Sequence, residues 1–323
     1  MLAYSKGLFF TKETLAIQNV EASINAKNPL LVILNAFSLN FLSTLSNNGN
    51  IIAVVVISIV LGIIFQQMKE QVSILKKLID EVNEITKNCL NFVILKLSPI
   101  GIFSLLIRTF AQYGITYLIP ALVYMLITTL ALLIILFIIF PLLVWYKAKI
   151  KPQVFIKKVY KVAIFAFSTS SSAASLPLAQ KTVTEDFNIK QSTASFVVPL
   201  ASTINMTGTA IMQVIATLFI AACANYDIGL MQIISILLLT VVGSISTPAA
   251  PGAGAILLFT IISGMGFVNP AAIAAYSLII AINRPVEMLV TAVNVVDDVV
   301  SSLMFENSLK EKQVINDIVL ERV

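Results

Sequence analysis

Two groups of polar side chains interrupt an otherwise apolar chain, and both could bind a small ligand. The first is a run of five hydroxyl residues, Ser168 to Ser172, within FSTSSSAASLP (residues 167–177). The second lies near the C-terminus, where five polar residues share an arc of about 80° on a helix that turns about 100° per residue. These five are Arg284, Glu287, Thr291, Asn294 and Asp298. Their side-chain oxygens can bond a ligand or backbone groups that a helix break leaves free.

The composition is that of a membrane protein. Of the 323 residues, 58% are hydrophobic and 11% are charged, whereas soluble domains carry about 25% charged residues. No charged residue lies between Arg108 and Lys147, and Asp227 is the only one between Lys190 and Arg284. Because a helix crosses the bilayer with about 20 apolar residues, we predict an integral, multi-pass protein of the cell (inner) membrane.

Basic residues gather in two stretches, Lys69–Lys77 and Lys147–Lys161. The positive-inside rule assigns these loops to the cytoplasm, and the loops near residues 112–114 and 225–227, which lack Lys and Arg, to the outside. The net charge of +5 is therefore explained by topology, and no nucleic-acid partner is predicted.

The elements that position the polar groups are interrupted helices. Residues 153–183 and 229–268 each consist of two short apolar arms around a small-residue tip, the second tip being STPAAPGAGA (246–255). Residues 192–223, interrupted at STINMTGT, and 270–305 are long apolar segments that each carry an Asn motif. Unpaired backbone groups are costly in lipid, so such breaks must be buried in protein or line a wet cavity. Paired broken segments indicate a transporter site at the bilayer midplane.

We therefore predict an all-α polytopic membrane protein, an inverted-repeat transporter fold with two re-entrant helical hairpins and broken helices. Two of these polar groups also have a simpler, structural interpretation. The serine run is also typical of a helix–helix packing face, and Arg284 with Glu287, three residues apart, is typical of a structural ion pair.

An enzyme is not predicted, and no residue is assigned a catalytic role. The chain has no histidine, so a Ser-His intramembrane protease is excluded. An aspartyl type needs two facing carboxylates on separate helices, whereas Asp297 and Asp298 are adjacent and point about 100° apart.

Four motifs resemble those of the dicarboxylate/amino acid:cation symporter family, the glutamate-transporter family. They are FSTSSSAASLP, STINMTGTA, STPAAPGAGAI and TAVNVVDD, in the family's order of hairpin 1, helix 7, hairpin 2 and helix 8. The resemblance covers residues 30–305, and the motifs are specific as a set. It implies symport of an amino acid or dicarboxylate with Na⁺ or H⁺ by an elevator-type mechanism, in a homotrimer within the lipid bilayer.

The resemblance also implies a role for individual residues. It places substrate at Ser171, Ser172, Thr209, Glu287, Thr291 and Asn294. It assigns one cation site to Asn205, Asn294 and Asp298, and a second to Thr203, Met206 and the backbone around Ser244, Ile245 and Thr247. Na⁺ is the metal expected at these residues, and no cofactor is implied beyond this coupling ion or a proton.

The sequence departs from the family pattern at four positions. Thr207 stands where helix 7 usually carries Asp, which removes a charge from a further cation site, and Asp297 stands where helix 8 usually carries Gly. Members that carry acidic substrates usually have an arginine where this chain has Val290 or Ser170. These changes favour a neutral amino acid over glutamate or aspartate as the substrate.

The predicted domains are an extracellular loop region (1–50), scaffold and trimerisation helices with one transport-domain helix (51–150), the transport core (151–305) and a cytoplasmic tail (306–323). Family members have three further crossings before the segment that begins near Ile51, and no 20-residue apolar span is expected in residues 1–50. An alternative function is therefore an inactive remnant, or one fragment of a split transporter that needs a separate N-terminal partner chain.

Overall fold

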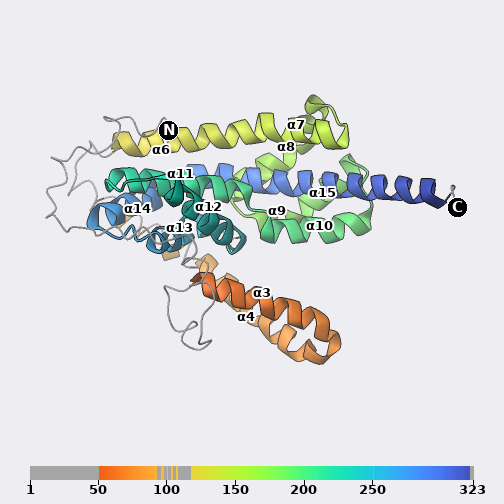
Figure 1. Ribbon diagram of the computed structural model, residues 1–323, viewed down its shortest axis with the longest axis horizontal. Coiled ribbons are helices and arrows are strands. Elements are labelled where there is room, and N and C mark those ends of the chain that lie inside the picture. Colours follow the sequence, from red (N-terminus) through yellow and green to blue (C-terminus); the bar gives the residue numbers. More distant parts are fainter. Residues whose placement is uncertain are drawn as a thin grey trace. The chain divides into compact units, whose positions relative to one another are not determined.

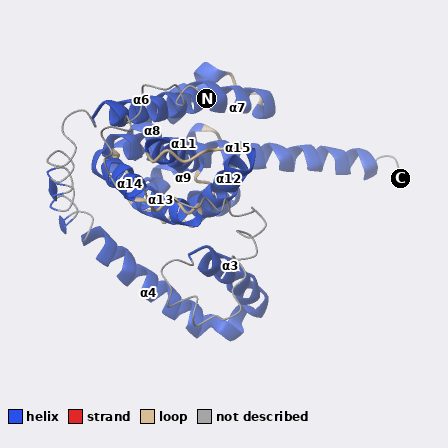
Figure 2. Ribbon diagram, turned by 60° about the vertical axis from the view of Figure 1, so that its left-hand side comes forward, coloured by secondary structure: helices blue, strands red, loops and turns tan. Residues whose placement is uncertain are grey.

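The computed structural model describes residues 51–92, 96–97, 100, 103–104, 107, 118–249 and 251–320. The described residues form helices joined by short loops, with no strand among them (Figure 2). Three of these helices are long and apolar enough to cross a membrane, Ile119–Ala148, Gln191–Cys223 and Arg284–Leu309. The predicted all-α, multi-pass membrane architecture is thus confirmed. The predictions for residues 1–50 and for the loop near 112–114 lie outside the described residues.

The chain divides into two compact units. The first comprises Met1–Tyr124, Gln213–Ser246 and Pro251–Asn283, and the second comprises Met125–Met212, Thr247–Ala250 and Arg284–Val323. These units reflect packing, whereas the domain boundaries expected at residues 50, 150 and 305 concern roles in the membrane and stay a prediction.

The second unit is organised around one long helix, α15 (Arg284–Leu320), which packs against α7, α8, α9 and α10 (Figure 1). Its partners are α7 (Phe140–Ala148), α8 (Pro152–Thr169), α9 (Ser172–Lys181) and α10 (Gln191–Ile204). Residues 290–300 of α15 are all buried. This stretch and the turn before it carry five polar or charged residues. Because the helix is buried on every side here, these residues contact other parts of the protein rather than solvent.

Two of the predicted breaks lie in this unit. At the serine run, Ser170 adopts a left-handed conformation with φ of 50° and ends α8, while its N–H donates to the carbonyl of Ala166. Ser171 then caps α9, because its hydroxyl accepts from the N–H of Ala174. In STINMTGT, α10 ends at Ile204 and α11 (Thr207–Cys223) begins after Asn205 and Met206.

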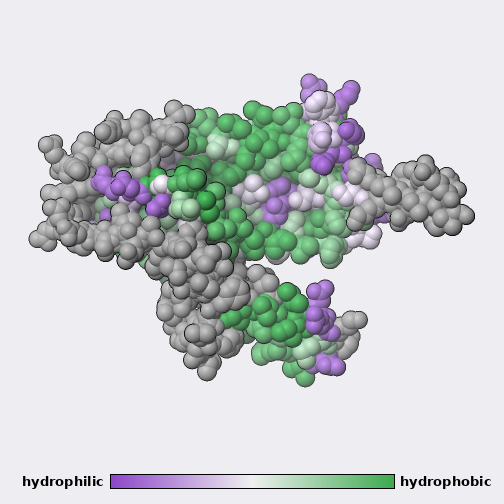
Figure 3. Space-filling view, in the orientation of Figure 1, coloured by the Kyte–Doolittle hydropathy of each residue, from purple (hydrophilic) through white to green (hydrophobic). Residues whose placement is uncertain are grey.

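One side of the second unit is apolar. It includes α6 (Leu118–Ile134), of which the residues after Tyr124 belong to this unit, and a π-helical turn, Ile135–Ile139, that leads into α7. Hydrophobic side chains cover this face, and hydrophilic ones gather at the turn between α7 and α8 (Figure 3). Trp145 and Tyr146 are exposed just before Lys147, as expected where a helix leaves the bilayer.

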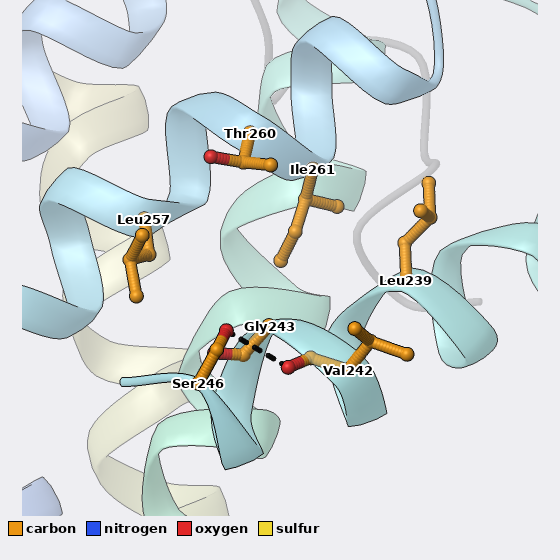
Figure 4. A pocket seen from close by; sticks show the side chains of 7 residues that line it. All are labelled: Leu239, Val242, Gly243, Ser246, Leu257, Thr260 and Ile261. Atoms are coloured by element: carbon orange, nitrogen blue, oxygen red, sulfur yellow. Dashed lines mark hydrogen bonds between the residues drawn. The ribbon is translucent and has the colours of Figure 1, made fainter. Parts of the chain in front are cut away.

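The first unit contains α3 (Ile51–Met68), a 3₁₀ turn (Lys69–Val72), α4 (Ser73–Phe92) and the part of α11 from Gln213 onward. It also contains α12 (Leu230–Ile245), α13 (Ala253–Gly264) and α14 (Pro270–Ile282). The arms α12 and α13 pack on each other, and a Cβ on Gly243 would lie 3.3 Å from Ile261. A small hollow remains between these arms, beside the hydroxyl of Ser246, which donates to the carbonyl of Val242 at 2.9 Å (Figure 4).

The last predicted crossing, residues 270–305, is also broken. Helix α14 ends at Ile282, Asn283 follows, and α15 begins at Arg284. Pro285 is the second residue of α15, where the missing N–H costs no helical hydrogen bond. The segment after Asn307 is not a separate element, because α15 continues to Leu320.

Candidate functional site

The polar stripe of α15 faces the protein interior. Glu287, Thr291, Asn294 and Asp298 are between 2% and 9% exposed, whereas Arg284, at the start of the helix, has a half-exposed side chain. In a membrane helix, ionisable and amide side chains that are buried in this way are candidates for function by default.

Asn294 joins α15 to the start of α11. Its Oδ1 accepts from the N–H of Gly208 at 2.7 Å and of Thr209 at 3.4 Å. Its Nδ2 donates to the Thr209 hydroxyl at 2.9 Å and lies 3.4 Å from the sulfur of Met206. The first N–H groups of a helix have no partner within that helix, so Asn294 supplies the missing cap from another segment. Three predicted site residues, Asn294, Thr209 and Met206, are therefore in contact.

A glycine makes this contact possible. A Cβ on Gly208 would lie 2.7 Å from the carbonyl oxygen of Val290 and 3.0 Å from Asn294 Oδ1. Both distances are too short for a real side chain, so the backbones of α11 and α15 approach each other here as only glycine allows.

A second polar contact lies at the break between α10 and α11. Thr207, the first residue of α11, donates its hydroxyl to Asp297 Oδ2. Asn205 donates its Nδ2 to the Ser301 hydroxyl at 2.9 Å, and its Oδ1 lies 3.5 Å from the Thr207 hydroxyl. Asp297 is 7% exposed. These side chains surround the interrupted backbone with oxygen atoms from two helices.

Asp298 is the more deeply buried of the two adjacent aspartates, at 2% exposed. Its Oδ1 has no hydrogen-bond partner among the residues that the structure describes. A buried carboxylate oxygen without a partner is costly, so a bound cation or a proton would satisfy it.

The two hairpin tips meet in the second unit. The hydroxyl of Ser171 donates to the carbonyl of Ala249 at 3.3 Å. Ser172, the first residue of α9, is 5% exposed, and Thr247, on the second tip, is also 5% exposed. The N-terminal end of α9 thus lies beside the backbone of the second tip, a position where free N–H groups favour an anionic group such as a carboxylate.

Other predicted site residues have simpler surroundings. Arg284 and Glu287 form the ion pair expected under the structural interpretation, with Nη1 and Oε2 3.6 Å apart. The Thr291 hydroxyl donates to the backbone carbonyl of Glu287. Thr203 is exposed and donates to the carbonyl of Leu200.

Ser244 and Ile245 close α12 in the first unit, where the Ser244 hydroxyl donates to the carbonyl of Val241. They stay predicted ligands of the second cation site.

Sequence reasoning missed the contact between Thr207 and Asp297. Both positions had been recognised as departures from the family pattern, but as two separate ones. The charges could have linked the two positions. Relative to the family pattern, the change at position 207 removes one negative charge and the change at position 297 adds one. Ser301, one helical turn after Asp297, was also missed, because a serine on a helix carries little information by itself.

Comparisons with known proteins identify the family of the chain. The model of the sodium:dicarboxylate symporter family matches residues 5–308. Excitatory amino acid transporter 1 of Ambystoma tigrinum is 33% identical over 254 residues, which cover 78% of this chain and 46% of the relative. The human protein of the same name is 32% identical over the same shares.

An excitatory amino acid transporter of Caenorhabditis elegans is 25% identical over 290 residues, 85% of this chain and 54% of the relative. The chain thus spans about half the length of the curated relatives it matches. The predicted resemblance is confirmed, and with it the interpretation that the chain is of a transporter class rather than an enzyme class. With its apolar spanning helices, broken arms and matching motifs, the chain belongs to the sodium:dicarboxylate symporter family.

Proposed function

We propose that this chain carries the substrate- and cation-binding core of a secondary active symporter, which moves an amino acid or dicarboxylate across the membrane together with Na⁺. The observation that supports this best is the contact between two helix breaks 78 residues apart, where Ser171 of the first tip meets Ala249 of the second. Two broken elements that share one location are the arrangement in which transporters bind a substrate.

The proposed substrate is a neutral amino acid. Its carboxylate would lie at the N-terminal end of α9, near Ser171 and Ser172, and Glu287 would meet its ammonium group. Asn294, Thr209 and Thr291 complete the proposed substrate contacts. An acidic side chain would need a cation, yet Val290 and Ser170 stand where acidic-substrate members carry arginine. Arg284 is engaged with Glu287, which supports the same choice.

The proposed coupling ion is Na⁺, bound by Asp298 together with Asn205 and Asn294. A carboxylate and amide oxygens suit a hard monovalent cation, and the unpartnered Oδ1 of Asp298 supports a ligand there. The second site, with Thr203, Met206 and the backbone around Thr247, remains part of the same proposal. A homotrimer working by an elevator-type movement is the proposed assembly.

Uptake by the purified chain in proteoliposomes tests the proposal. Radiolabelled alanine or serine should accumulate when Na⁺ is imposed outside, and not when choline replaces it. Asp298→Asn should abolish gradient-driven uptake because the amide cannot balance the charge of the cation. Asp227→Asn, which removes the same charge from an exposed loop, is the matched control and should transport normally. Unchanged Na⁺ dependence in Asp298→Asn would refute the assignment.

The alternative function gives a different result in this assay. A fragment of a split transporter would show no uptake alone and would regain it on co-expression with a chain that carries the first three crossings. An inactive remnant would show none in either case. Robust uptake by the chain alone would contradict both forms of the alternative.

A further inference from the structure

The buried carboxylate of Asp297, at a position where the family usually carries glycine, lies among side-chain oxygen atoms of three other residues. The hydroxyl of Thr207 and one carboxylate oxygen of Asp297 are in hydrogen-bond contact, and Asn205 Oδ1 lies 3.5 Å from the same hydroxyl. Ser301, one helical turn after Asp297, accepts from the amide of Asn205. Two of the four residues flank the break between α10 and α11, and the other two lie on α15.

The charge of Asp297 has no basic partner nearby. It is 7% exposed, and it makes no ion pair among the residues that the structure describes. Neither α10 nor α11 contains a lysine or arginine. Arg284, on the same helix, lies 13 residues away, or about 20 Å along the axis. Hydrogen bonds from neutral donors offset only part of the cost of burying a full charge, so a bound cation or a proton would complete this site.

Thr207 and Asp297 both depart from the family motif, and the two departures compensate each other in charge. Position 207 has lost the carboxylate that the family motif usually has on helix 7, and position 297 has gained one where the motif usually has glycine. The structure brings these two side chains into contact across the interface of α11 and α15. The local charge is therefore the same as in the motif, but a different helix carries it.

We infer that Asp297 is a cation ligand, and that its carboxylate binds Na⁺ together with the Thr207 hydroxyl and the side-chain oxygens of Asn205 and Ser301. The site shares Asn205 with the one proposed at Asp298 but uses a different carboxylate, because adjacent helical residues point about 100° apart. All its ligands are oxygen atoms and only one is charged, which suits a monovalent alkali cation rather than a transition metal or Ca²⁺. This inference rests on the proposed symport function, which it extends by one named cation ligand.

Direct Na⁺ binding tests the inference without transport. The full chain in lipid nanodiscs is titrated with NaCl at constant ionic strength, with choline as the replacement cation, and the thermal midpoint Tm is followed. A cation that binds only the folded state stabilises it by RT ln(1 + [Na⁺]/Kd), so the rise of Tm with the Na⁺ concentration reports the apparent Kd. Asp297→Asn should weaken the apparent Na⁺ affinity about tenfold or more, since affinity follows the charge of the ligand set. Asp227→Asn, in the exposed loop, should leave it unchanged.

An exchange variant makes the test specific. Thr207→Asp combined with Asp297→Thr returns the carboxylate to α11 and the hydroxyl to α15. Its Na⁺ affinity should come back to within about threefold of the unmodified chain, since the site then regains the charge that sets its affinity. Asp297→Asn with unchanged Na⁺ affinity, or an exchange variant as weak as Asp297→Asn, would overturn the inference. If Asp297→Asn fails to fold, Thr207→Val still tests it, because loss of the hydroxyl ligand must weaken Na⁺ binding.

The outcomes also separate this inference from the proposed function. A chain that binds Na⁺ through Asp297 but shows no uptake in proteoliposomes, either alone or on co-expression with a chain that carries the first three crossings, refutes symport and leaves the cation site standing. A chain that shows Na⁺-driven uptake with unchanged Na⁺ affinity in Asp297→Asn keeps the proposed function and removes this ligand.

Discussion

The side-chain amide of Asn294 does for α11 what a capping residue normally does for its own helix. It accepts from the N–H groups of Gly208 and Thr209 and donates to the Thr209 hydroxyl. In this conformation α11 therefore engages the amide oxygen and one N–H of Asn294, while the sulfur of Met206 lies 3.4 Å from the amide nitrogen. A substrate that bound this amide would have to replace some of these bonds, which ties substrate binding to the first turn of α11.

Removing this amide should destabilise the protein even without substrate. Asn294→Ala leaves the buried N–H of Gly208 without an acceptor, and we expect a loss of about 1–3 kcal/mol in the free energy of unfolding. Asn83→Ala, at an exposed position of α4, is the control and should change stability by less than about 0.5 kcal/mol. Thermal unfolding in detergent, followed by circular dichroism, measures both, and equal Tm values would contradict the capping role.

At the scale of elements, the first hairpin reverses at one strained residue. Ser170 has φ of 50°, and the left-handed conformation costs a non-glycine residue about 1–2 kcal/mol. Its hydroxyl is buried without a hydrogen-bond partner among the described residues, so the side chain offsets none of this strain. The turn between α8 and α9 is therefore set by the packing of its arms and by the cap that Ser171 provides.

Glycine substitutions at two neighbouring serines should have opposite effects. Ser170→Gly relieves the left-handed strain and should raise the stability by about 0.5–1 kcal/mol. Ser168→Gly lies within α8, where it should cost about 0.5 kcal/mol in helix propensity and lose the bond from the Ser168 hydroxyl to the carbonyl of Ile164. The difference in Tm between the two variants reports this directly. If Ser170→Gly lowers Tm as much as Ser168→Gly does, the left-handed conformation of Ser170 is not strained.

The close packing of α11 against α15 also depends on a single residue, Gly208. Gly208→Ala would bring a methyl group to 2.7 Å from the carbonyl oxygen of Val290, so the helices must separate, at a cost of about 1–3 kcal/mol. Gly62→Ala provides the matched control, because a Cβ at that position of α3 has nothing within 4 Å and should stabilise its helix by up to about 1 kcal/mol. Unfolding curves of both variants check the contrast, which fails if Gly208→Ala is as stable as Gly62→Ala.

For the whole molecule, substrate choice follows from the distribution of charge. The nearest arginine on α15, Arg284, lies about 15 Å along the axis from Asn294 and is paired with Glu287. A second substrate carboxylate would be buried without a cation and would cost several kcal/mol. Unlabelled alanine or serine should therefore inhibit uptake at lower concentrations than aspartate. Inhibition by aspartate well below the concentration required for serine would overturn the assignment to neutral amino acids.

The helix breaks and the buried stripe could be read from the sequence because their signals are local. A run of serines within an apolar segment predicts an interruption near Ser170, and residues three and four apart share a helix face, so the burial of Asn294 and Asp298 followed from spacing alone. What Asn294 contacts did not follow, because Gly208 lies 86 residues earlier in the chain. The contact between Thr207 and Asp297 depends on how two helices pack, and no periodicity within either helix encodes that.

The close approach at Gly208 also has a consequence for the gene. Every single-base change that alters the meaning of a glycine codon gives either a stop or a residue with a Cβ, and any such residue at position 208 would collide with the carbonyl oxygen of Val290. Single-base changes that replace this glycine should therefore be selected against, whereas those at Gly62 should be tolerated. In a library of random variants sorted for correctly inserted protein, residue 208 should remain almost always glycine while residue 62 diversifies.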